Sequence, residues 1–192
     1  MTSILLAGPA TEPISLADAK AYLRVDSGDE DNLISTLIAA GRVHLEAITR
    51  RAMIDQNWRV ILDAWPQGDE VSLPLGPFRA LLAVRIFDEA GAATELPLAQ
   101  FLPETGSAPG RIVLPGTVAG MPLARERLAV EIDFTAGYGE DPGDVPAGLK
   151  QALMSLVAHW FEHREAVLMA GSGAIVPASF DQLIAPYRVI AL

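Results

Sequence analysis

The sequence contains no cysteine among its 192 residues. This absence excludes disulfide scaffolds, thiolate zinc sites, iron–sulfur clusters and cysteine nucleophiles together. Long hydrophobic runs are also missing, since no window approaches the roughly 18 uninterrupted apolar residues of a membrane-spanning helix. The first residues lack the basic stretch and the long apolar segment of a signal peptide. These absences predict a soluble, cytoplasmic protein without a membrane segment.

Positive charge is scarce as well. The sequence has 14 lysine and arginine residues and 24 aspartate and glutamate residues, so the formal net charge is −10. Because duplex affinity comes largely from basic side chains that neutralise phosphates, this balance argues against a general nucleic-acid binder. Only Lys20 and Lys150 are lysines, and the other 12 basic residues are arginines. Arginine is enriched at protein interfaces, although biased codon use explains the same composition equally well.

Three helices are predicted from apolar residues that recur with the 3.6-residue period. The first covers residues 15–24, where Ser15 can cap the first amides. The second is long and covers 30–51, and the third covers 146–165. The third helix carries one apolar stripe, so it should pack against the second. A hydrophobic content of 51% excludes disorder of the whole chain, and the length of 192 residues suits one domain or a core domain with an insertion.

The apolar period changes to two between residues 57 and 139, and proline and glycine punctuate this stretch at about the spacing expected between short strands. The last strand is predicted to bury Leu128 with its alternate neighbours and to expose Asp133 on a solvated face. Strands are expected near residues 58–62, 71–73, 82–86, 112–114 and 128–134, with loops at 97–110 and 115–126.

The sequence after the third predicted helix differs from both the helical and the β-rich stretches. Gly171, Ser172 and Gly173 predict a flexible joint. The residues beyond the joint are too apolar for a solvated tail, so they predict a partner surface. Their apolar side chains are Val176, Phe180, Leu183, Ile184, Tyr187, Val189 and Ile190.

The predicted fold class is therefore α+β. An antiparallel helical core, formed by helices 15–24, 30–51 and 146–165, carries an inserted small β-rich unit and an extended C-terminal tail. The expected divisions are 1–56 for the N-terminal core helices, 57–139 for the β-rich unit, 140–170 for the C-terminal core helix, and 171–192 for the joint and tail.

One motif carries a known chemistry. The sequence HWFEH matches H-x-x-E-H, in which His159 and His163 would hold zinc and Glu162 would act as general base. A catalytic zinc needs a third protein ligand, and the nearest downstream acids are Glu165, in the same turn, and Asp181, beyond the joint. The two intervening aromatic residues belong to the apolar stripe, which favours a polar helix end over a metal site. The sequence predicts no catalytic, cofactor-binding or metal-binding residue.

Several short motifs follow one another along nearly the whole chain, and their order is more informative than any one of them. They are EPISLADAK at 12–20, LRVD at 23–26, the stretch 31–50, Trp58, LDAWP at 62–66, LP at 73–74, PGRI at 109–112, FTAGYG at 134–139, VP at 145–146, AHWFEHRE at 158–165, Pro177, and LIAPYR at 183–188. In this order they resemble the head–tail connector, or adaptor, family of tailed bacteriophages and gene transfer agents.

The resemblance implies a structural protein of the virion neck, made in the cytoplasm of the host bacterium. Such a protein forms a ring, expected to be a dodecamer, beneath the portal, where it joins the capsid to the tail and continues the DNA channel. The implied partners are the portal protein, neighbouring copies of the chain, and a next neck or tail protein such as a stopper. DNA would pass without specific binding, which suits a ring of subunits with a charge of −10 if the acids face inward.

The C-terminal tail would reach into the portal. The portal-binding residues implied by the resemblance are Val176, Phe180, Leu183, Ile184, Tyr187, Arg188, Val189 and Ile190.

Two alternatives stay open at this stage. One is a zinc-dependent hydrolase that uses His159, Glu162 and His163, which a stoichiometric metal content would identify. The other is a different neck component, such as a stopper or tail-completion protein, which would bind tail components rather than the portal. The sequence does not distinguish a phage, a defective prophage and a gene transfer agent as the source.

Overall fold

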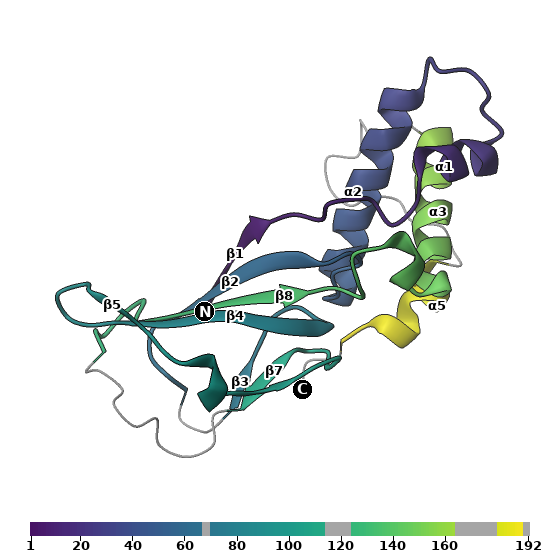
Figure 1. The fold of residues 1–192 in the computed structure, drawn as a ribbon. Helices are drawn as coiled ribbons and strands as arrows, with labels where there is room; N and C mark the ends of the chain where they lie inside the picture. Colours follow the sequence, from purple (N-terminus) through teal and green to yellow (C-terminus); the bar gives the residue numbers. More distant parts are fainter. Residues whose placement is uncertain (67–69, 114–123, 164–179, 190–192) are drawn as a thin grey trace.

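The computed structural model describes residues 1–66, 70–113, 124–163 and 180–189. A helical bundle forms one end of the molecule, and two antiparallel sheets form the other (Figure 1). The predicted α+β class is confirmed. No helix in these ranges combines the length and the apolar character that a membrane crossing requires.

The bundle consists of α1 (Leu16–Leu23), α2 (Asp31–Thr49), α3 (Ala147–Glu162) and the short α5 (Phe180–Ile184), which the 3₁₀ turn η3 (Ala185–Tyr187) extends. The three predicted helices are confirmed to within a few residues at each end. Ser15 caps α1 as expected, because its hydroxyl oxygen accepts the Asp18 amide at 3.0 Å. Acidic Asp18 and Asp31 lie in the first turns of α1 and α2, where carboxylates stabilise the positive helix end.

Helices α2 and α3 pack closely side by side at Gly41. A Cβ atom at this position would lie 2.7 Å from Leu153 Cδ1, so any larger residue would force the buried Leu153 side chain to shift. The bundle core is formed by fully buried side chains from all of its helices. They include Ile34, Ile38, Leu45, Leu149, Leu153, Leu156, Val157, Phe180 and Ile184.

The larger sheet has the strand order β1-β2-β8-β4-β5, and the smaller has the order β3-β7-β6. The strands of the larger sheet are β1 (Thr2–Ala7), β2 (Gln56–Leu62), β8 (Val130–Ala136), β4 (Phe78–Phe87) and β5 (Ala93–Glu95). Those of the smaller are β3 (Glu70–Ser72), β7 (Arg111–Val113) and β6 (Leu102–Glu104). The 3₁₀ turn η1 (Leu98–Gln100) lies between β5 and β6, and η2 (Pro142–Asp144) lies between β8 and α3.

The predicted β-rich unit is confirmed with two differences. Strand β1 was not predicted, although it pairs with β2 along the edge of the larger sheet. The stretch 97–110, expected to be a loop, contains η1 and β6. One hydrophobic core lies between the two sheets, with Phe78 and Phe134 stacked at 6.4 Å and Ile112 fully buried against them.

Strand β8 corrects the predicted burial of two residues. Leu128 precedes the strand with a φ of 52° and is 50% exposed, because its amide is turned toward the carboxylate of Asp63. Asp133 is only 5% exposed, because arginines from both neighbouring strands cover it. The face predicted to be solvated is therefore closed by ion pairs.

Candidate functional site

The apolar C-terminal segment, expected to need an external partner, packs on the chain's own bundle. Phe180 and Ile184 are 1% and 0% exposed and belong to the core that α2 and α3 share. Leu183 and Tyr187 pack against the same core. The structure thus corrects the expectation that residues 180–189 have no partner within the chain. Val176, Ile190 and the predicted joint lie outside the described residues.

Polar contacts also hold this segment. The Arg51 Nε atom donates to the Tyr187 carbonyl at 2.7 Å, and the Val189 amide donates to the Thr49 carbonyl at 3.4 Å. The Tyr187 ring lies against α3 at Gly148, where a Cβ atom would be 2.8 Å from the phenol oxygen. The segment is therefore anchored to the end of α2 and to the start of α3.

Arg188 faces solvent on the same segment. Its Nη2 atom contacts Asp181 Oδ1 at 2.6 Å, and both side chains are well exposed. An exposed ion pair of this kind contributes little to stability, so these charged groups are available to a partner.

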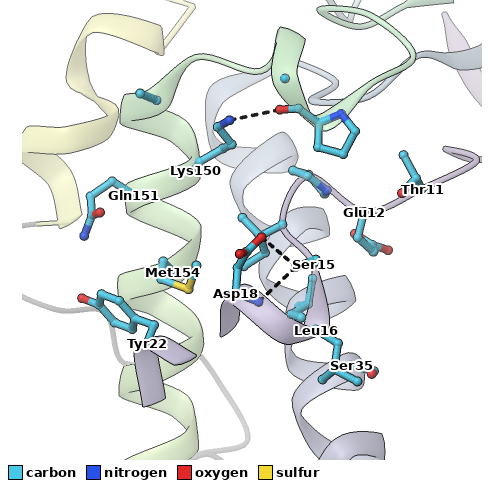
Figure 2. Close-up of a pocket in the computed structure, with 16 residues that line it drawn as sticks. Thr11, Glu12, Ser15, Leu16, Asp18, Tyr22, Ser35, Lys150, Gln151 and Met154 are labelled. Atoms are coloured by element: carbon cyan, nitrogen blue, oxygen red, sulfur yellow. Dashed lines mark hydrogen bonds between the residues drawn. The ribbon is translucent and has the colours of Figure 1, made fainter. Parts of the chain in front are cut away.

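A groove of about 690 Å³ lies between residues 11–22, α2 and the first half of α3 (Figure 2). Several of its polar groups bond within the subunit. Ser15 and Asp18 bond each other, and the Lys150 ammonium donates to the Pro142 carbonyl at 3.1 Å. The remaining lining is largely apolar and includes Ile14, Leu16, Tyr22 and Met154. The groove therefore combines an apolar floor with a few polar groups, and it holds no cluster of catalytic side chains among the described residues.

A buried carboxylate connects the bundle to the larger sheet. Glu46, on α2, is 8% exposed, and its Oε1 atom accepts the Met53 amide at 2.9 Å and the Gln56 side-chain amide at 2.7 Å. Its Oε2 atom accepts from Arg42, which also pairs with Glu12. Burial raises the pKa of Glu46, and these hydrogen bonds offset only part of that effect. The sequence analysis did not identify this network.

A second network closes the outer face of the larger sheet. Asp133, on β8, accepts two hydrogen bonds from Arg59, at 2.6 and 2.9 Å, and one from Arg85 at 2.8 Å. Burial opposes ionisation of Asp133, but the two guanidinium groups outweigh it and hold its pKa below the usual value. The network fixes β2, β8 and β4 relative to one another.

The H-x-x-E-H motif lies at the end of α3. The rings of His159 and His163 are 4.4 Å apart, and His163 Nδ1 lies 3.0 Å from the His159 carbonyl. Glu162 is exposed, and Asp181 pairs with Arg188. In the part of the chain that the structure describes, no group of three or more histidine, cysteine, aspartate or glutamate residues could hold a metal ion. The geometry does not favour the zinc-hydrolase alternative.

Solved structures resemble this chain along its whole length. The neck of an empty gene transfer agent (GTA) particle, computed with C6 symmetry, contains a chain that matches it with a TM-score of 0.83 and 28% identity, over 100% of this chain and 97% of that one. The virion of a native GTA particle and the neck of a native GTA particle computed with C12 symmetry match with TM-scores of 0.82 and 0.76, at the same identity and coverage. No family model matches the sequence, and no curated protein matches it either.

These similarities support a structural component of a virion neck. They extend over the helical bundle, both sheets and the C-terminal segment, since the whole chain is covered. The neighbours are structural parts of a particle, which suggests a non-enzymatic role.

Proposed function

We propose that this chain is the head–tail adaptor of a phage or phage-like particle. It forms a ring beneath the portal, joins the capsid to the tail, and continues the channel through which DNA passes. The observation that carries the proposal is the match of the entire chain to chains in gene transfer agent necks. A neck computed with C12 symmetry supports a ring of twelve copies.

The chemistry of the subunit is consistent with this role. Its charge of −10 disfavours adhesion of a nucleic-acid backbone that moves past it. Its polar networks, around Glu46 and Asp133, brace the bundle and the sheet internally rather than lining a reaction centre. A rigid, non-adhesive subunit is what a DNA conduit requires.

We propose that the C-terminal segment contacts the portal. With α5 packed on the bundle, the charged groups that the segment offers to a partner are Asp181 and Arg188. Binding through Phe180 and Ile184 requires α5 to detach from α2 and α3. The portal must then bury these two side chains in place of the bundle. The next neck protein binds the opposite side of the ring.

The proposal is tested by mixing the purified protein with its cognate portal and determining the mass and the image of the complex. A closed ring on the portal is expected. The substitution Arg188→Glu should weaken portal binding, whereas Arg111→Glu should not, because Arg111 is equally exposed but lies on β7 in the β-rich unit. Binding to tail components without binding to the portal would contradict the adaptor role and favour a stopper or tail-completion protein.

A further inference from the structure

A basic cavity lies where the bundle meets the two sheets. It has a volume of about 350 Å³, and its polar lining includes Arg51, Arg79, Thr105 and Tyr138. Arg51 lies two residues after the end of α2, Arg79 lies on β4, and Tyr138 lies two residues after β8. Three separate elements thus converge on one cavity that contains two guanidinium groups.

The charge of Arg51 is not neutralised within the described residues. Its hydrogen bonds go to neutral acceptors, the Tyr187 carbonyl at 2.7 Å and the Tyr138 hydroxyl at 3.4 Å. Of the carboxylates in residues 1–66, 70–113, 124–163 and 180–189, none lies within salt-bridge distance of this side chain, which is only partly exposed. Arg79 has one acidic contact, Asp55, at 3.4 Å. A half-buried cation with neutral partners favours an anionic ligand in the cavity.

The same chain carries exposed acids that lack a cationic partner. Asp26 and Asp29 lie on the turn between α1 and α2, and neither has a salt bridge among the described residues. This turn is at the free end of the bundle (Figure 1), whereas the cavity is lined by Arg51, just beyond the end of α2 that meets the sheets. With 19 residues, α2 is about 28 Å long, so the acids of one copy cannot reach its own cavity.

We propose that the turn carrying Asp26 and Asp29 in one copy of the chain places its carboxylates in the Arg51–Arg79 cavity of the next copy. The contact joins two different patches, so it is heterologous and can repeat around a closed ring. Arginine pairs carboxylates in a planar, bidentate geometry, which fixes orientation as well as attraction. A net charge of −10 disfavours the phosphates of DNA as the competing anion. This inference rests on the ring of the proposed function.

The experiment measures ring assembly of the full chain on its cognate portal by native mass spectrometry. The double variant Asp26→Arg with Asp29→Arg should weaken subunit association by about tenfold or more. Its Tm should fall by no more than about 4 °C, because both residues are exposed on a turn and only Asp29 lies next to the start of α2, where a positive charge is mildly unfavourable. The matched control, Glu89→Arg with Glu126→Arg, reverses two exposed acids away from this turn and should assemble like the wild type.

A rescue variant separates the contact from a general loss of folding. Arg79→Glu alone should lose the ring, and adding Asp26→Arg with Asp29→Arg to the same chain should restore it. Rings that form equally well from the wild type and the acid-reversed variant would overturn the contact and leave the adaptor role standing. A wild type that forms no ring with the portal would overturn the proposed function and this contact with it. A third outcome is that the wild type binds duplex DNA, and that Arg79→Glu abolishes this binding while the ring persists. This outcome would show that the cavity binds phosphate, and it would overturn the inference.

Discussion

Replacing Phe180 with alanine tests whether the C-terminal segment belongs to the fold of the free subunit. The Phe180 side chain is 1% exposed, lies 6.2 Å from the His44 ring between centroids, and shares a core with Trp160 and Ile184. Truncation of a buried phenylalanine costs about 3–5 kcal/mol, as lost transfer free energy plus an unfilled cavity. Because α5 has only five residues and can relax, we expect a value near the lower limit, about 3 kcal/mol.

The assay is urea unfolding at neutral pH, with thermal unfolding as a second measure. For a chain of this size, 1 kcal/mol corresponds to about 2–4 °C in Tm, so Phe180→Ala should lower Tm by about 6–12 °C. The matched control is Gln182→Ala in the same helix. Gln182 is exposed, and its loss should change the free energy of unfolding by less than about 0.5 kcal/mol.

A loss below about 1 kcal/mol for Phe180→Ala would refute the reasoning. It would mean that the free subunit is equally stable with the segment detached, so that the segment acts only as a tail for another protein. Removal of residues 180–192 should likewise destabilise the subunit at least as much as the single substitution, because it also removes Ile184 and the bond from Arg51 to Tyr187.

Three further results are expected. Asp133→Asn should cost about 2 kcal/mol in urea unfolding at pH 7, because it weakens charge-assisted bonds to two arginines. Since the folded pKa of Asp133 is depressed, its contribution is fully present above its unfolded pKa of about 3.9 and is lost as the pH falls through the folded pKa. The variant and the wild type should therefore converge in stability in acid, and a pH-independent difference would contradict the ion-pair account. Gly41→Val should lower the free energy of unfolding by about 1–3 kcal/mol by forcing α2 away from α3, and an unchanged Tm would show that the contact is looser than described. Combined replacement of His159 and His163 with alanine should preserve far-ultraviolet circular dichroism and ring assembly, while elemental analysis of the wild type should find no stoichiometric zinc.

The three main helices were predictable because each combines a local start signal with an apolar stripe of its own. Strand β1 was not, because it has no such pattern. All six of its residues are exposed, including Ile4 and Leu5, and the strand is held by backbone pairing with β2. That partner lies about fifty residues further along the chain, and no local period encodes such a pairing.

The polar networks show a similar limit. Alternation placed Asp133 correctly on the face opposite Phe134, but burial of that face depends on Arg59 and Arg85 from adjacent strands. The register that brings the three side chains together is a property of the assembled sheet. Glu46 was missed for a related reason, since its partners at Met53 and Gln56 meet it only after the chain turns from α2 into β2.

The C-terminal segment shows what apolar composition alone can predict. The sequence indicated that its apolar residues must be buried. It did not indicate which surface would bury them. Binding to a surface of the same chain costs little entropy, because the segment is already linked to that surface. Closing the intervening loop costs only about 0.6 kcal/mol more for each doubling of its length. Burial of one large apolar side chain contributes about 1.5–3 kcal/mol, and both Phe180 and Ile184 are fully buried. The segment is therefore stable on its own subunit, and any partner that takes up these side chains must bury them more favourably than α2 and α3 already do.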